Sequence, residues 1–125
     1  MPDLEVATRR RGAVVVVEPR GFINAHTVHR FEEILNRLAA DGDARIVISG
    51  RSLSYVASAG FGAIMGILEE VRASGGDIRI SDLNATVAHI FEVLGFDRLC
   101  QTFPTEAEAV ESFSTAEAGG KSGDP

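Results

Sequence analysis

The chain has 125 residues, of which 45% are hydrophobic and 24% charged, and this composition fits one globular domain with a substantial core. The formal net charge of −6 argues against a nucleic-acid partner, because phosphate backbones are bound by clustered Lys and Arg. The one basic cluster is Arg9, Arg10 and Arg11, which we interpret as a solvated strand edge that discourages edge pairing.

Targeting signals are missing from the pattern. Cys100 is the only cysteine, so an internal disulfide is impossible, in keeping with a reducing compartment. No apolar run approaches the roughly 20 residues of a membrane span. Residues 1–5 show neither the basic region nor the apolar core of a signal peptide. We expect a cytoplasmic protein with no membrane contact.

The N-terminal segment predicts strands. Leu4–Thr8 alternates weakly and is typical of an edge strand. Ala13–Val17 is a continuous run rich in β-branched residues, which predicts a strand buried on both faces. Pro19 and Gly21 interrupt it, and Phe22–Ile23 can resume the extended backbone.

The first helix is predicted from Asn24, a good N-cap, to Gly42, a left-handed C-terminal cap. Its apolar face has the three- and four-residue spacing of a helix. The residues of this face are Val28, Phe31, Ile34, Leu35 and Leu38.

The middle of the chain predicts a short buried strand at Arg45–Ser49, a polar connection at Gly50–Ser54 and a second helix from Ser58. Gly75–Gly76 ends that helix. The residues predicted to share its inner face are Phe61, Ile64, Met65, Leu68 and Val71.

The remaining pattern predicts a strand at Ile78–Ile80, a third helix capped by Asp82 or Asn84 and ended by Gly95, and a last helix opened by residues 104–106. The apolar positions of these two helices are Val87, Ile90, Phe91, Leu94, Val110 and Phe113. From Ser114 to Pro125 the chain is too poor in apolar residues to pack, and we expect disorder.

Strands that alternate with helices predict right-handed crossovers. The fold class is therefore α/β, with a mixed, mainly parallel central sheet covered by about four helices. We expect one domain over residues 1–113 and a disordered tail over residues 114–125.

Enzymatic constellations are weak. His26 and His29 lie three apart on a predicted helix, but nothing acidic or sulfur-bearing is spaced to complete a metal site. Cys100 is interpreted as a buried small residue. Gly60, Gly62 and Gly66 do not have the spacing of a dinucleotide fingerprint. We therefore expect no metal, no cofactor and no enzymatic activity.

Ser58 is the candidate functional residue, at the mouth of the second helix. The purely structural interpretation is that Ser58 is an N-cap or first-turn residue of the helix. The functional interpretation is a phosphoacceptor, because a phosphate there would lie beside free N–H groups at the positive end of the helix dipole.

Four stretches in order resemble the STAS domain, and within it the stand-alone anti-sigma-factor antagonists of bacteria. They are Gly21–Asn24, Ser58–Phe61, Gly75–Gly76 and Val87–Phe96, and the resemblance covers roughly Leu4 to Phe113. It implies a STAS-like fold and a phospho-switched binding module that sequesters an anti-sigma serine kinase of the GHKL type. This releases a sigma factor for transcription, and a serine phosphatase resets the switch.

The same resemblance assigns the site. It implies that Ser58 is phosphorylated and that Asn24 lies near it and contributes to kinase binding. The partner surface is expected to comprise Asn24, Ala57, Ser58, Ala59, Gly60, Phe61 and Gly62. Periodicity favours a core position for Phe61 and Met65, whereas an exposed Phe61 would serve as an apolar anchor.

One position departs from the family pattern. The residue before the serine is commonly Asp or another polar residue, and here it is Ala57. The alternative function is therefore a STAS scaffold subunit of a sensory, stressosome-like assembly or of a lipid-transport complex, which never cycles through phosphorylation.

Overall fold

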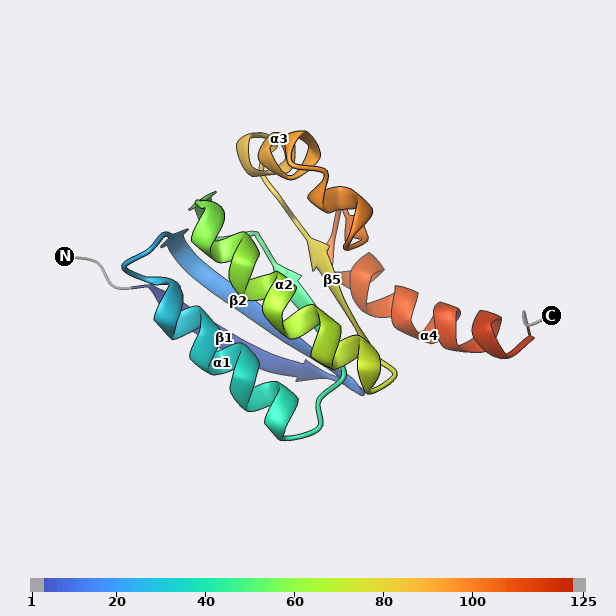
Figure 1. The fold of residues 1–125 in the computed structure, drawn as a ribbon. Coiled ribbons are helices and arrows are strands. Elements are labelled where there is room, and N and C mark those ends of the chain that lie inside the picture. The colour runs from blue at the N-terminus through green and yellow to red at the C-terminus, as the bar shows by residue number, and fades with distance from the viewer. Residues whose placement is uncertain (1–3, 123–125) are drawn as a thin grey trace.

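The computed structural model describes the backbone of residues 4–122 and the side chains of residues 4–114. Figure 1 shows the helices and strands in space. They are, in chain order, β1 (Glu5–Arg11), β2 (Val14–Ile23), α1 (Val28–Ala40), β3 (Arg45–Ser49), β4 (Leu53–Val56), α2 (Ser58–Ala73), β5 (Asp77–Ser81), α3 (Ala85–Val93), a 3-10 turn (Phe96–Arg98), β6 (Thr102–Phe103) and α4 (Glu106–Ser122).

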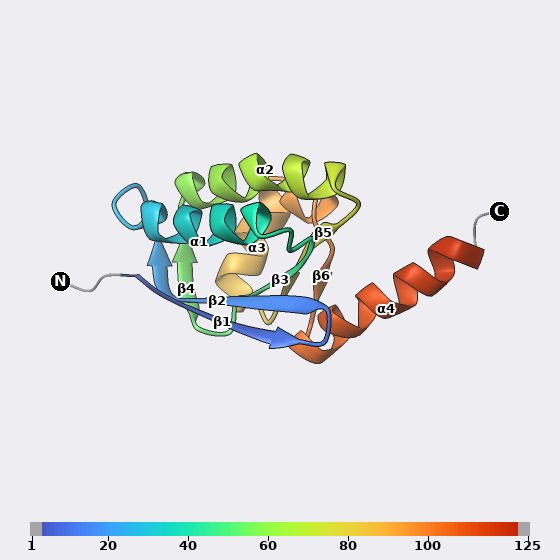
Figure 2. The same ribbon diagram turned by 90° about the horizontal axis from the view of Figure 1, so that it is seen from below.

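The six strands form one mixed sheet with the order β1-β2-β3-β5-β6, and β4 pairs with the far end of β2. Among the strands that the structure describes, only β1 and β2 pair in antiparallel fashion, and the other pairs are parallel. The mixed, mainly parallel sheet and its four helices confirm the predicted fold class. Figure 2 shows α1 and α2 side by side over one side of the sheet, with α4 starting on the other side and extending away from it.

Two hydrophobic clusters cover the two faces of the sheet, and the side-chain alternation of β2 and β3 feeds both. Val15, Val17 and Ile48 join the larger cluster beneath α1 and α2. Val16 and Val47 join the smaller cluster beneath α4. This burial of both faces explains the uninterrupted apolar runs in the sequence.

Strand β4 is absent from the expected elements, since the sequence predicted a polar connection as far as Ser54. The strand is only four residues long, and its residues Ser54 and Tyr55 are exposed. Its extended form comes from pairing with Gly21–Ile23 of β2, more than thirty positions earlier in the chain. Pro19 and Gly21 accordingly bend β2 without ending it, and Gly21 has a φ of +117°.

Helix α1 begins later than expected, since its N-cap is Thr27 and not Asn24. Asn84 caps α3 by accepting a hydrogen bond from the backbone N–H of Val87. Of the two predicted caps, Asp82 and Asn84, the second is therefore correct. Two residues predicted to face inward lie on the surface: Met65 is 49% exposed and Leu94 is 57% exposed. Helical spacing places Met65 at the edge of the apolar face of α2, and Leu94 follows the last residue of α3.

The arginines of β1 do more than solvate an edge, which corrects the sequence interpretation. Arg9 binds two buried carboxylates, Glu18 at 2.9 Å and Glu106 at the start of α4. Arg11 binds Glu106 at 3.1 Å, and Arg10 binds Asp43 at 3.0 Å. The cluster therefore attaches α4 to the edge of the sheet.

Helix α4 is described as far as Ser122, beyond Ser114, where disorder was expected. Ala116, Glu117 and Ala118 have high helix propensity, which favours a helical backbone as far as Ala118. Residues 123–125 of the expected tail lie outside the described residues. The end of the domain at residue 113 stays a prediction.

The ion pairs of Glu106 with Arg9 and Arg11 should make the free energy of unfolding depend on pH. Burial raises the pKa of Glu106, but hydrogen bonds from Arg9 and Arg11 outweigh it, and the net pKa lies below the ordinary value of 4.5. Since the folded state lowers this pKa, its stabilisation is fully present above pH 4.5 and is lost as the pH falls through the folded-state pKa.

We expect Glu106→Gln to lower the free energy of unfolding at pH 7 by about 1–3 kcal/mol and to flatten its decline in acid, as measured by urea denaturation. Glu108→Gln, an exposed neighbour in the first turn of the same helix, is the matched control and should change little. Equal effects of the two substitutions would contradict the role of these ion pairs.

Candidate functional site

Two parallel strands end together and bring the predicted site residues into contact. Ile23 of β2 is aligned with Val56 of β4, and the backbone N–H of Ala57 donates to the carbonyl of Ile23 at 2.8 Å. Asn24 and Ser58 are the next residues on the two segments. The pairing of β2 with β4 therefore places the turn before α1 beside the start of α2.

Asn24 organises a turn and does not cap α1. Its side-chain oxygen accepts hydrogen bonds from the backbone N–H of His26 at 2.8 Å and of Thr27 at 3.0 Å. The Thr27 hydroxyl in turn donates to the carbonyl of Phe22 at 3.0 Å. Such an Asx turn fixes the side chain of Asn24 in place, half-buried at the edge of the site.

Ser58 is the first residue of α2 and is exposed. Ala57 is the N-cap and has no side chain that could cap the helix, so Ser58 is a first-turn residue and not the cap. The hydroxyl of Ser58 makes no hydrogen bond to any residue that the structure describes. The first turn of α2 also carries no acidic residue, so nothing there opposes an incoming negative charge.

Gly60 and Phe61 lie in the core, which narrows the expected partner surface. A Cβ on Gly60 would meet Cγ1 of Val56 at 2.7 Å and Cγ2 of Ile23 at 3.0 Å. Phe61 is only 6% exposed and makes edge contacts with the rings of Phe91 and Phe96. The exposed candidates that remain are Ser58 and Gly62, with Asn24, Ala57 and Ala59 partly exposed beside them.

The sequence analysis missed an aromatic pair beside the site. Phe22 and Tyr55 are aligned across β2 and β4, and they are 40% and 48% exposed. Their neighbours Ile23 and Val56 point into the core on the other face. Alternation of exposed and buried residues in both strands was the available signal, but it needs the β2–β4 pairing to be recognised.

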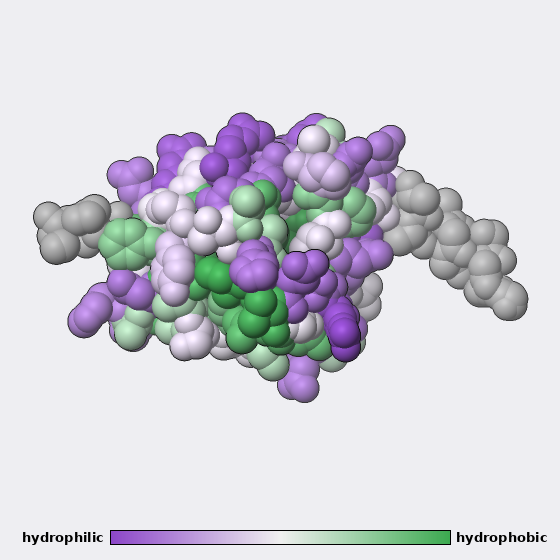
Figure 3. Space-filling view, turned by 90° about the horizontal axis from the view of Figure 1, so that it is seen from above, coloured by the Kyte–Doolittle hydropathy of each residue, from purple (hydrophilic) through white to green (hydrophobic). Residues whose placement is uncertain are grey.

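The end of α3 adds a second apolar surface. Val93 is 69% exposed and Leu94 is 57% exposed. Figure 3, which views the molecule from the side where α3 lies, shows hydrophobic residues gathered amid hydrophilic ones. The contact of Phe61 with Phe91 joins α3 to the first turn of α2, so this surface belongs to the same end of the molecule as Ser58.

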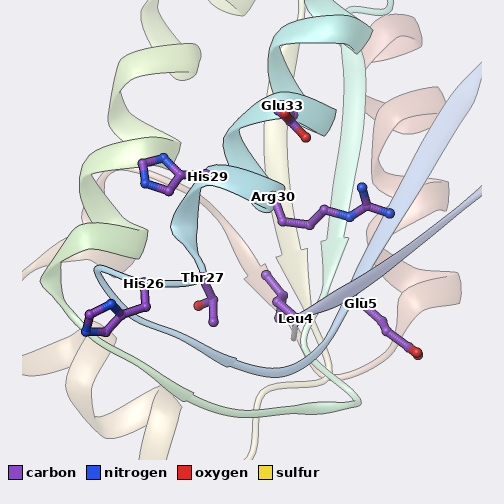
Figure 4. A pocket seen from close by; sticks show the side chains of 7 residues that line it. All are labelled: Leu4, Glu5, His26, Thr27, His29, Arg30 and Glu33. Carbon is purple, nitrogen blue, oxygen red and sulfur yellow. The ribbon is translucent and has the colours of Figure 1, made fainter. Parts of the chain in front are cut away.

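The alternative chemistries gain no support from the geometry. His26 and His29 line a cleft of about 460 Å³ at the start of α1, and Figure 4 shows Glu5 pointing away from both rings. Among the described side chains, those of residues 4–114, no three His, Cys, Asp or Glu are grouped to hold a metal ion. Burial raises the pKa of Cys100 to about 12, so its thiol is unreactive. No helix within the described range is long and apolar enough to span a bilayer.

The chain belongs to the STAS domain family, whose model matches residues 5–109. The match covers all six strands and the helices α1 to α3, and it includes the site at Asn24 and Ser58. The predicted family is thereby confirmed.

Its relatives include the anti-sigma-B factor antagonist of Staphylococcus aureus, which is 25% identical over 97 residues, or 78% of this chain and 90% of the relative. The fold is also similar to those of solved structures, including two anti-sigma factor antagonists. An anti-sigma factor antagonist from Mycobacterium paratuberculosis has a TM-score of 0.81 at 18% identity, over 88% of this chain and 93% of that one. The Bacillus antagonist SpoIIAA, solved in its unphosphorylated form, has a TM-score of 0.70 at 20% identity, over 88% of this chain and 98% of that one.

The close approach at Gly60 predicts a contrast between two glycines of α2. We expect Gly60→Ala to lower the free energy of unfolding by about 1–3 kcal/mol, because the methyl group would collide with Val56 and Ile23. Gly62 has no atom within 4 Å of an added Cβ, so Gly62→Ala should be neutral or stabilising by up to about 1 kcal/mol. Urea denaturation of both variants checks the contrast, and equal stabilities would be the contrary result.

Proposed function

We propose that this protein is an anti-sigma-factor antagonist, a phospho-switched binding module that sequesters an anti-sigma serine kinase and so frees a sigma factor. The observation that carries the proposal is Ser58, at the start of α2 beside Asn24, whose exposed hydroxyl has no hydrogen-bond partner among the described residues. The names of the relatives support it, because the curated relative and both solved folds are antagonists of this class.

A phosphate on Ser58 would change the surface by charge and by bulk. It adds about −1.5 to −2 charges at neutral pH and three acceptor oxygens. The free N–H groups of the first turn of α2 can receive these oxygens, so the modified form is stable in itself. The same charge would meet a partner docked over Ser58 and Gly62, and it would weaken that complex by repulsion and desolvation.

The proposed partners follow from this switch. The unmodified protein binds an anti-sigma factor that is also its serine kinase, of the GHKL type, and a serine phosphatase restores the unmodified form. We propose no enzymatic role for the protein itself, because the switch needs only the exposed hydroxyl of Ser58, which the partner kinase modifies. The proposed setting is the cytoplasm.

Ala57 favours a second candidate function, a STAS scaffold subunit that never cycles. A polar residue at this position would be an N-cap, and Ala57 gives neither a cap to α2 nor a contact to a kinase. The scaffold would use the same surface to hold a stable partner, and its Ser58 would stay unmodified in cells.

Peptide mapping by mass spectrometry separates the two. The full chain is incubated with ATP and the GHKL kinase encoded nearest its gene, and we expect one phosphate, on Ser58. Ser58→Ala should take up none, because no other serine stands at the same helix start. Ser74→Ala, an exposed serine at the far end of α2, is the matched control and should be modified as the parent is.

A kinase that is active on another antagonist but leaves this chain unmodified would contradict the phospho-switch and favour the scaffold. Phosphate on a residue other than Ser58 would leave the class of function standing but would contradict the assignment of the site.

A further inference from the structure

A charged cleft lies on the face of the sheet that carries α4, away from the α1 and α2 side. Its volume is about 580 Å³, within the usual size of small-molecule sites. The side chains that line it come from β1, β2, the connection between β3 and β4, the end of β5 and the start of α4. They are Arg9, Arg11, Glu18, Arg20, Arg51, Asp82, Thr105, Glu106 and Ala107.

The arginines of the cleft outnumber the carboxylates that bind them. Glu18 and Glu106 are buried, and their closest partners are Arg9, Arg11 and the hydroxyl of Ser52 at 2.6 Å. Glu18 and Glu106 are therefore already occupied.

Arg20 and Arg51 have much looser contacts. Arg20 lies 3.7 Å from Glu18, and Arg51 lies 3.7 Å from Glu106, beyond hydrogen-bonding distance. Their side chains are 52% and 60% exposed. Each guanidinium carries five N–H donors in a planar fork, so both arginines keep donors to offer to an incoming oxyanion.

The lining of the cleft also includes a carboxylate in an unusual setting, that of Asp82. Asp82 has a φ of +57°, a left-handed conformation that non-glycine residues rarely adopt. Its buried Oδ2 has no hydrogen-bond partner among the described residues. Strain and an unpaired polar atom at one residue are features that folded proteins keep at functional sites.

Two buried serines end the neighbouring strands β3 and β5, and one of them, Ser81, directly precedes Asp82. Ser49 and Ser81 are aligned across β3 and β5 at 0% exposure, and the structure describes no partner for either hydroxyl. Val47 shares a hydrophobic cluster with Phe113 of α4, and the guanidinium of Arg79 lies over the Phe113 ring. Ser49 and Ser81 are two residues further along the same strands, so they point to the same face of the sheet. Apolar side chains would pack better at these two buried positions. The two serines therefore indicate that the ends of β3 and β5 serve more than packing.

We propose that this cleft binds a small phosphate monoester that also carries hydroxyl groups, such as a sugar phosphate. Arg20 and Arg51 hold the phosphate between them, because its three oxygens can be shared by two guanidinium forks. Asp82, after a rotation of its side chain, accepts hydrogen bonds from the hydroxyl groups. The site is separate from Ser58 and stands whether or not the proposed function holds.

The test uses the isotopically labelled full chain and three probes: ribose 5-phosphate, ribose and inorganic phosphate. We expect ribose 5-phosphate to cause saturable NMR shifts in the amides of Gly50, Arg51 and Asp82. Ribose should cause none, because it lacks the phosphate, and inorganic phosphate should bind more weakly, because it lacks the hydroxyl groups that Asp82 accepts.

Substitutions assign the contacts. Arg20→Gln and Arg51→Gln should each weaken the binding of ribose 5-phosphate about tenfold, the loss of one charged hydrogen-bonding partner. Both side chains are more than half exposed, so the buried pairs of Arg9 and Arg11 stay intact and the variants fold. Arg37→Gln, an exposed arginine on α1 across the sheet, is the matched control and should bind as the parent does.

Asp82→Asn is the sharpest variant, because Asn adopts the same left-handed backbone without the charge. It should raise the affinity for inorganic phosphate and reduce the preference for ribose 5-phosphate. The proposal is overturned if ribose 5-phosphate causes no saturable shift by about 10 mM, because a dissociation constant above this concentration is too weak for specific recognition. It is equally overturned if inorganic phosphate binds as tightly as the ester, or if Arg20→Gln and Arg51→Gln have no effect, since the cleft would then hold an adventitious ion only.

Discussion

The pairing of β2 with two successive strands is the constraint on which the rest of the structure depends. The first half of β2 pairs with β3, and its end pairs with β4, both in parallel. The hydrogen bond from Ala57 to Ile23 closes this second pairing at 2.8 Å. It fixes where α2 begins, and it sets Ser58 beside the Asx turn of Asn24. Without it, the two site segments would be unconnected loops more than thirty residues apart in the chain.

The site is consequently built on rigid elements, although its functional atoms are at the surface. Gly60 lets the first turn of α2 settle against Val56 and Ile23, and Phe61 anchors the same turn to Phe91 and Phe96. A helix start held this firmly keeps its N–H groups in fixed positions, which is what a phosphate or a docked partner needs. The connection between β3 and β4 carries Arg51 and Ser52 on the α4 face of the sheet. On that face, the ion pairs of Glu106 with the arginines of β1 attach α4 to the sheet.

Local patterns in the sequence predicted most of the elements, and long-range pairings account for what they missed. Ala13–Val17 and Arg45–Ser49 were recognisable as buried strands because both faces are covered, and Gly42, Gly75 and Gly95 ended their helices with positive φ angles. Strand β4 has no such pattern, since it exists through its pairing with β2. The partner of Arg9 was equally hidden, because Glu106 lies 97 positions away. For the site, the position of Ser58 at a helix start followed from the pattern, whereas the exposure of Phe22 and Tyr55 depends on a pairing that no local pattern shows.

The decisive test of the proposed phospho-switch is the affinity of the proposed kinase partner for the two forms of this protein. The unmodified chain and the chain carrying one phosphate on Ser58 are each titrated into the proposed anti-sigma kinase by isothermal calorimetry. We expect the phosphate to weaken binding at least about a hundredfold, because an unmatched charge would be buried in the interface. Equal affinity of the two forms would contradict it, because Ser58 would then lie outside the surface that the partner covers.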